Sequence, residues 1–180
     1  MTLGSHQQTV GKSQAHVTPK WILDALGEFD LDPAAADPRP WDCARRNFTE
    51  RDDGLSRPWT GRVFLNPRVD RWMLRMAEHN HGVALLHVRP ETDWFVPCWQ
   101  HASGMLFLRK RVIFCKPDGS AQTISNPNSK HFGKPANSGA PVALISFGAR
   151  DLDCLRTCGI DGYLLTEWER VVAERRQAAE

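Results

Sequence analysis

The sequence predicts an α/β fold in which a central, mostly parallel sheet is covered by helices on both faces. Apolar runs such as VALLHV (83–88) and PVALISFG (141–148) are typical of strands that are buried on both sides. Segments with helical spacing of apolar residues, such as DRWMLRMAEH (70–79), alternate with these runs. With 180 residues, the chain is long enough for one domain with a substantial core.

The first predicted helix follows a polar stretch, residues 1–17, which predicts a flexible N-terminal arm. Thr18 is expected as the N-cap and Pro19 as the first helical residue, because these residue types are favoured at those positions. Trp21, Ile22, Ala25 and Leu26 would share one face, and Gly27 would end the helix.

A very short strand is predicted over 29–31, and it ends at Asp32-Pro33. Residues 34–60 contain several Pro, Asp and Gly residues and no long apolar period, so they predict an irregular loop. A strand over 62–65 and the helix over 70–79 follow this loop. Further strands are predicted over 83–88, 105–108, 111–115 and 141–148, with a helical segment over 91–102 that Pro97 limits.

The predicted organisation is a flexible N-terminal segment (1–17), one α/β domain (18–148) and a C-terminal extension (149–180) that ends in a charged helix over 166–178. This tail helix either packs on the domain or mediates dimerisation. The polar segment 116–138 is either a disordered crossover or, if the protein binds nucleic acid, a loop that faces DNA.

Composition excludes several classes of function. No run approaches the roughly 18 apolar residues of a membrane span, and no secretory pattern opens the chain, so a cytoplasmic protein is expected. Five cysteines without a CxxC pair predict reduced thiols, and the histidine spacing predicts no metal site. The net charge of +2 does not by itself indicate nucleic-acid binding, and the basic run Arg109-Lys110-Arg111 is either solvated surface or a phosphate contact.

Polar residues follow two of the predicted strands, and ligands of such sheets bind beyond the carboxyl ends of the strands. Asp30 or Asp32 could accept hydrogen bonds from amino or hydroxyl groups of a cofactor. The Asn66 amide oxygen and the Pro67 carbonyl could together hold an exocyclic amino group, which is a positioning role. Taken singly, the Asp-Pro and Asn-Pro dipeptides are also typical of simple turns.

Several segments in a fixed order carry a more specific signal: GSHQ, TPKWILDALGEFDLDP, DDGLSRPWTGRVFLNP, WMLRMAEHNHGVALLHVRPETDWF, MLFLRKRVIF and NSGAPVALISFG. Over residues 4–148 this series resembles the phage DNA N6-adenine methyltransferase family, the Dam-like group of tailed phages and prophages. The resemblance implies a Rossmann-like S-adenosylmethionine-dependent methyltransferase fold, DNA adenine as the substrate, and action in the cytoplasm of a host cell.

The resemblance also implies roles for individual residues. Asn66 and Pro67 match the first half of the family's catalytic NPPY motif. Cofactor contacts are implied for Thr18, Pro19, Asp30, Asp32 and Pro33. Contacts to the substrate pocket or to DNA are expected of Arg68, Arg89, Thr92, Asp93, Trp94, Arg109, Lys110 and Arg111.

The chain departs from the family pattern at Arg68-Val69, where the family has a second proline and an aromatic residue. That aromatic ring stacks on the flipped adenine, and base stacking contributes about 1–3 kcal/mol. Trp72 is a possible substitute. Three interpretations follow: a weak or altered methyltransferase, an enzyme that transfers a different group to a base, or a catalytically degenerate protein that binds DNA, cofactor or a host protein.

Overall fold

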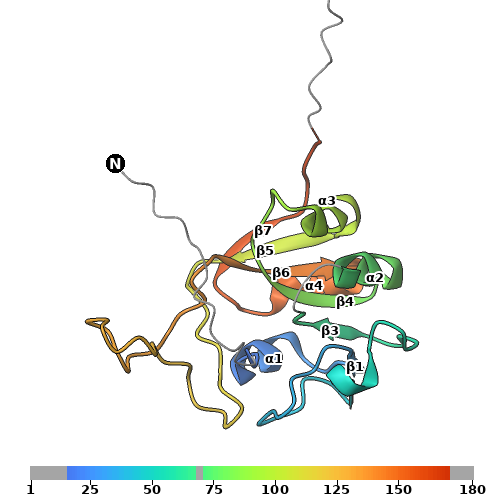
Figure 1. Ribbon diagram of the computed structural model, residues 1–180. Helices are drawn as coiled ribbons and strands as arrows, with labels where there is room; N and C mark the ends of the chain where they lie inside the picture. Colours follow the sequence, from blue (N-terminus) through green and yellow to red (C-terminus); the bar gives the residue numbers. More distant parts are fainter. Residues whose placement is uncertain (1–15, 68–70, 171–180) are drawn as a thin grey trace, which may run out of the picture.

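The computed structural model describes residues 16–67 and 71–170, which form one seven-stranded sheet with helices on both faces (Figure 1). The helices are α1 (Lys20–Leu26), α2 (Arg71–His79), α3 (Val96–His101) and α4 (Ala149–Thr157), with short 3-10 turns η1 (Glu50–Asp52) and η2 (Asp93–Phe95). The strands are β1 (Leu31–Asp32), β2 (Arg46–Asn47), β3 (Val63–Leu65), β4 (Gly82–His87), β5 (Gly104–Leu108), β6 (Val142–Phe147) and β7 (Gly162–Leu165).

The strand order is β2-β1-β3-β4-β6-β5-β7. The first four strands of this order pair in parallel, whereas β6 is antiparallel to β4 and β5, and β7 is antiparallel to β5. The predicted α/β architecture is therefore confirmed, but the expectation of a mostly parallel sheet is corrected to a mixed one. The physical reason lies in the connection of β5 to β6, which contains no crossover helix and therefore returns the chain antiparallel.

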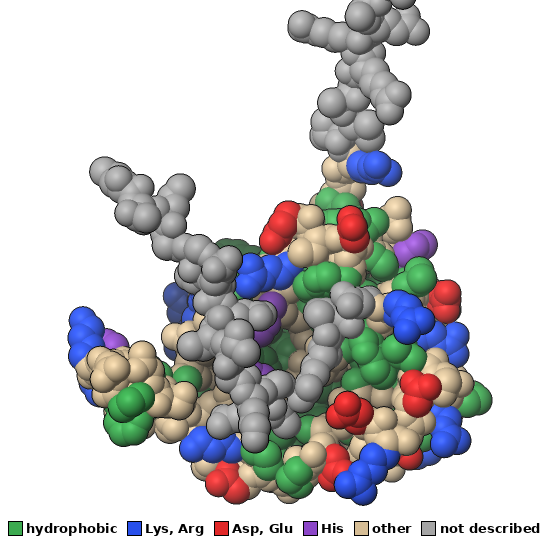
Figure 2. Space-filling view, in the orientation of Figure 1, with side chains coloured by type: hydrophobic (Ala, Val, Ile, Leu, Met, Phe, Trp, Pro, Cys, Tyr) green, Lys and Arg blue, Asp and Glu red, His purple; other side chains and the backbone are tan. Residues whose placement is uncertain are grey.

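Two apolar clusters lie on opposite faces of the sheet, because successive residues of a strand point to opposite sides. Leu144 of β6 belongs to the cluster that contains the buried residues of α1 and α4, and its neighbour Ile145 belongs to the cluster under α2 and α3. Helices thus cover both faces, as predicted. On the surface, charged side chains of both signs are interspersed over the face shown in Figure 2.

Most predicted elements are present, with bounds that differ by one or two residues when η2 and α3 together are compared with the helical segment predicted over 91–102. Two are not: residues 111–115 contribute only an isolated bridge at Cys115, and residues 166–170 of the expected tail helix are not helical. The remainder of that helix lies outside the described residues. Within the predicted extension (149–180), β7 joins the same sheet beside β5, and α4 packs against this sheet. None of the described helices is long and apolar enough to cross a membrane.

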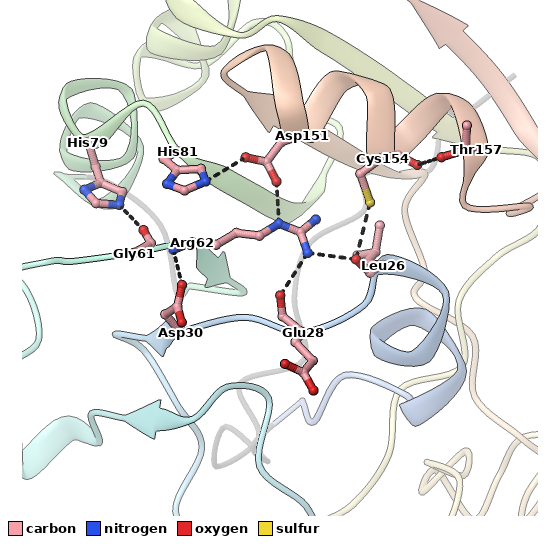
Figure 3. A network of polar contacts seen from close by, with 10 residues as sticks. All are labelled: Leu26, Glu28, Asp30, Gly61, Arg62, His79, His81, Asp151, Cys154 and Thr157. Atoms are coloured by element: carbon pink, nitrogen blue, oxygen red, sulfur yellow. Dashed lines mark hydrogen bonds and ion pairs between the residues drawn. The ribbon is translucent and has the colours of Figure 1, made fainter.

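At the amino end of β3, a buried ion pair joins the two halves of the chain (Figure 3). The Nε of Arg62 donates to Asp151 Oδ1 at 2.6 Å, and its Nη1 donates to the carbonyls of Leu26 (2.8 Å) and Glu28 (3.0 Å). The guanidinium also lies 4.2 Å from the centre of the Phe29 ring. This network fixes α1 and the first turn of α4 against the sheet, at the opposite end of β3 from Asn66.

Candidate functional site

A cavity of about 1040 Å³ lies at the carboxyl ends of the neighbouring parallel strands β1, β3 and β4. Its wall consists of these strand ends, the residues before α1, the segments that follow β1 and β2, Trp72 of α2 and Phe114. The predicted site residues that line it are Thr18, Asp32, Pro33, Asn66 and Pro67. Trp72, the possible substitute for the family's aromatic residue, lines the cavity too. The remaining wall residues were not predicted as site residues, namely His16, Val17, Ala34–Asp37, Arg39, Cys43, Thr49–Arg51, Asp53, Gly54, Leu85–His87 and Phe114.

The Asn66 side chain is held by the segment that precedes α1. Its Nδ2 donates to the Thr18 hydroxyl oxygen at 3.0 Å and to the His16 carbonyl at 3.2 Å. Because both partners accept hydrogen bonds, the NH₂ group of the Asn66 side chain must face them. The amide oxygen, Oδ1, is therefore available to a ligand. Thr18 was expected to cap α1, but no side-chain bond caps the helix at its N-terminus, and the Thr18 hydroxyl serves Asn66 instead.

Asp32 is a buried carboxyl group at the end of β1, with 3% of its surface exposed. One oxygen accepts a hydrogen bond from the Ala34 backbone N–H at 2.9 Å. Burial raises the pKa of Asp32 to about 7, against the lowering effect of the Ala34 and Cys43 hydrogen bonds and of the Arg39 charge. The cavity therefore contains an acid whose charge changes near neutral pH, which is suited to a ligand that carries donors or positive charge.

The raised pKa predicts how stability depends on pH. Asp32 ionises near pH 4 when the chain is unfolded and near pH 7 when it is folded. Its contribution to the free energy of unfolding is therefore complete below about pH 4 and falls by about 1.4 kcal/mol per pH unit up to about pH 7. The Asp32→Asn substitution should abolish this decrease in the free energy of unfolding with rising pH. Urea unfolding of both proteins at several pH values checks it, and parallel stability curves from pH 4 to pH 8 would contradict it.

Three rings form one wall of the cavity. Phe114 is nearly buried, and the rings of His16 and His87 approach it edge-on, with centroids at 5.4 Å and 6.1 Å. Desolvation, and then the positive charges of His16 and Arg89, lower the pKa of His87. The His87 ring is therefore held in its neutral form at neutral pH, and it can pack against a flat ligand without placing a full charge there.

A further aromatic side chain lines the cavity from α2. Trp72 packs against the buried Trp59, with ring centroids at 6.2 Å and an interplanar angle of 24°. The Nε1 of Trp59 donates to the Gly54 carbonyl at 2.8 Å, which anchors the supporting ring. The cavity therefore has an indole wall close to the end of β3. Arg68, which was predicted to contact the substrate, lies outside the described residues.

Two predicted cofactor contacts are placed elsewhere. Pro19 precedes α1 and is not part of the cavity wall. Asp30 lies before β1, where its Oδ2 accepts a hydrogen bond from the Arg62 backbone N–H at 2.7 Å, and this bond lowers the pKa of Asp30. Of the two carboxylates between which the sequence could not choose, only Asp32 lines the cavity.

The four substrate residues predicted after β4 are not in the cavity wall either. Their contacts stabilise the turn into α3: the Thr92 hydroxyl donates to the Arg89 carbonyl at 2.8 Å, Asp93 begins η2, and the Trp94 ring packs edge-on against Phe95. Arg89 remains exposed, and its charge acts on His87 at the cavity.

The basic run lies just after β5. Arg109 Nε donates to Asp161 Oδ2 at 2.7 Å, so its charge is paired within the protein. Lys110 and Arg111 are exposed, and the charge of Arg111 also acts on His87. The three residues of the run therefore differ: Arg109 is paired with Asp161 in the turn before β7, whereas Lys110 and Arg111 face solvent.

Sequence reasoning did not identify the ring wall or the segment after β2 as parts of the site. His87 carried a usable signal, because it ends the buried strand β4 that neighbours β3. Thr49–Arg51, Asp53 and Gly54 gave none, since they belong to a polar loop without periodicity. Among the described residues, no group of three His, Cys, Asp or Glu side chains is arranged to hold a metal ion.

Comparison with known proteins identifies the family of the chain. The family model for DNA N-6-adenine-methyltransferase (Dam) matches residues 6–145, which include every described element from α1 to β5 and most of β6. No curated protein and no solved structure matches the chain in the same comparisons. Since the matched region is well over half of the chain and contains the whole cavity wall, the chain belongs to the DNA N-6-adenine-methyltransferase (Dam) family.

Proposed function

We propose that this protein is a phage or prophage enzyme that transfers a methyl group from S-adenosylmethionine to N6 of adenine in DNA. One observation carries the proposal beyond family membership: Asn66, at the end of β3, is oriented by Thr18 and His16 so that its amide oxygen is left for a ligand in the cavity. An oriented acceptor at this position suits an exocyclic amino group.

The chemistry follows from the position of the acceptors. Asn66 Oδ1 and the Pro67 carbonyl would accept the two hydrogens of the adenine amino group, which holds its nitrogen in place and increases its electron density. When bound, S-adenosylmethionine supplies an electrophilic methyl group. The amino nitrogen would form its bond to the methyl carbon as the sulfur–methyl bond breaks, and the electron pair of that bond would stay on the sulfur as a neutral thioether. This transfer needs no covalent intermediate with the protein, and the nitrogen would then release one proton to water.

The cavity fits such a cofactor in size and in chemistry. Its volume of about 1040 Å³ is at the upper end of ligand sites and leaves room for a nucleoside cofactor beside a base. Asp32, Glu50 and Asp53 line it and provide acceptors for amino and hydroxyl groups. The small side chains of Ala34–Ala36 let a ligand approach the backbone closely. These residues would hold the cofactor, and Asn66 would hold the base.

The family's aromatic residue is replaced by Val69, but the cavity still has rings. Trp72, supported by Trp59, and the ring wall of Phe114, His16 and His87 supply flat apolar surfaces on which a flipped base can stack. This favours an active enzyme over a degenerate protein that only binds DNA, cofactor or a host protein.

The test is mass spectrometry of nucleosides from DNA that has been co-expressed with the protein, in a host whose own DNA lacks N6-methyladenine. The expected result is N6-methyladenine with the wild-type protein and none with Asn66→Ala. A different new mass that also disappears with Asn66→Ala would show transfer of another group. Unmodified DNA, with the protein folded and able to bind DNA, would support the degenerate binding protein.

The basic run gives a separate prediction on DNA binding. Replacing Lys110 and Arg111 together by alanine should weaken binding and lower the slope of log K against log salt by up to about 1.8, or about 0.9 for each phosphate contact. Arg109→Ala should change the slope less, because Arg109 is paired with Asp161. Titrations of a DNA duplex between 50 and 200 mM salt, roughly the range over which such slopes are resolved, check this. Equal slopes for the double variant and the wild type would contradict it.

A further inference from the structure

Residues 116–138 form an arm that extends away from the sheet (Figure 1). The arm is a narrow ribbon in which the outgoing and returning segments pair through the backbone. Ala136 N–H donates to the Gln122 carbonyl at 2.7 Å, and Ile124 and Lys134 are joined by an N–H···O bond of 2.9 Å. The sequence left open whether this segment is a DNA-facing loop or a disordered crossover, and these bonds give it a defined structure.

The outer end of the arm combines an aromatic ring with positive charge. Phe132 is 58% exposed, although its backbone N–H is bound to the Ser129 carbonyl at 2.9 Å in a turn. Lys130 and Lys134 flank it and are exposed. Basic, histidine and apolar side chains gather at this end in Figure 2. From residue 119 to residue 138 the sequence has no acidic residue, so the charge of this segment is wholly positive.

Both ends of the arm are attached at the rim of the cavity. The outgoing end begins at Phe114, which lines the cavity, and at Cys115, whose N–H donates to the Val17 carbonyl at 2.9 Å. The returning end reaches Ser138, whose N–H donates to the Val112 carbonyl at 2.7 Å and whose backbone is also bonded to His87. A macromolecule that places one of its groups in the cavity would therefore meet the arm.

We propose that this arm contacts DNA beside the target adenine: the Phe132 ring stacks on or between bases, and Lys130 and Lys134 contact phosphates. The inference rests on the proposed function and identifies a further surface for the same substrate. A large apolar ring on an exposed tip is available for stacking, and bases of any sequence can stack on it. The uniformly positive charge around the ring favours a polyanion over a second copy of this chain, whose net charge is only +2.

The experiment measures binding of a fluorescent DNA duplex by anisotropy at several salt concentrations. Phe132→Ala should weaken binding roughly 5- to 100-fold with an unchanged salt slope, because stacking is not ionic. The double variant Lys130→Ala, Lys134→Ala should lower the slope by up to about 1.8. Phe132→Trp should restore the affinity. Tyr163→Ala is the matched control, since Tyr163 is 73% exposed on β7, and it should bind as the wild type does.

Wild-type affinity in Phe132→Ala would overturn the proposal. So would self-association of the wild type, measured by light scattering, that is lost in Phe132→Ala, because the ring would then serve a second copy. Failure of the proposed function is distinguishable. If Phe132→Ala binds DNA weakly but the wild type forms no N6-methyladenine, the arm stands and the methyltransferase activity falls. If the wild type methylates DNA and Phe132→Ala binds DNA as tightly as the wild type, the methyltransferase activity stands and the proposal for the arm is wrong.

Discussion

Asp151→Ala should destabilise the protein by about 3–5 kcal/mol, the cost of leaving one member of a buried ion pair without its partner. Arg62 and Asp151 are both buried, and Arg62 Nη2 already has no hydrogen-bond partner among the described residues. Removal of the carboxylate would leave the guanidinium with two carbonyls and the Phe29 ring. Since a domain of this kind is stable by only about 5–15 kcal/mol, a large part of its stability would be lost.

Urea unfolding at pH 7 measures this effect, and two further variants test its cause. Asp153→Ala, in an exposed pair with Arg156, should cost less than about 1 kcal/mol. The double variant Arg62→Met, Asp151→Leu should regain much of the loss, because an apolar pair of similar volume replaces a buried ion pair at little cost. An Asp151→Ala protein within about 1 kcal/mol of the wild type would show that the network of Figure 3 contributes little to stability.

Asn66→Ala should lower the rate of methyl transfer at least about 100-fold, because the adenine amino group would lose the acceptor that positions it. Affinity for S-adenosylmethionine should change little, since Asn66 is proposed to hold the base and not the cofactor. Single-turnover kinetics for the transfer step and calorimetry for the cofactor separate the two effects. A rate near that of the wild type would remove Asn66 from the mechanism.

Thr18→Val tests the orientation of the amide. The variant keeps the shape of the side chain and removes the hydroxyl that accepts from Asn66 Nδ2 at 3.0 Å. Loss of one neutral hydrogen bond of about 0.5–1.5 kcal/mol should lower the rate about 2- to 13-fold. Because the His16 carbonyl still accepts from the same NH₂ group, the effect should be much smaller than that of Asn66→Ala.

The sequence was informative wherever burial gives a strand or helix a clear apolar pattern. The runs that became β4 and β6 are buried along almost their whole length, and α2 has apolar residues at helical spacing, so all three were predicted within two residues. The strand over 62–65 was found for the same reason, and with it the position of Asn66 directly after a strand.

Elements held by backbone bonds and by distant contacts could not be predicted in this way. β2 is only Arg46–Asn47, two polar residues whose pairing with β1 defines the strand. β7 alternates between half-buried and exposed residues at the edge of the sheet and begins with Gly162, which weakened its strand signal. The expected strand over 111–115 consists mainly of residues with high β-propensity. In the structure these residues lie at the rim of the cavity, and only Cys115 pairs with other segments.

The site shows the same division. The sequence brings Asp32 and Asn66 to neighbouring strand ends, but it does not reveal that Thr18 bonds to Asn66 across 48 positions. Nor does it distinguish Asp30 from Asp32, which lie two positions apart and have opposite pKa shifts. The difference comes from solvent: Asp32 is buried in the cavity, whereas Asp30 accepts a backbone hydrogen bond at the surface.

The position of β6 has a consequence for how the chain is synthesised. This strand lies between β4 and β5 in the sheet but follows both of them in sequence, so the sheet is not continuous until Phe147 has left the ribosome. Until then, the edge of β4 that later pairs with β6 is an open template for other strands. We therefore expect nascent chains that end before residue 142 to be retained by chaperones or to aggregate, and the sheet to fold only after the residues up to Phe147 have been translated.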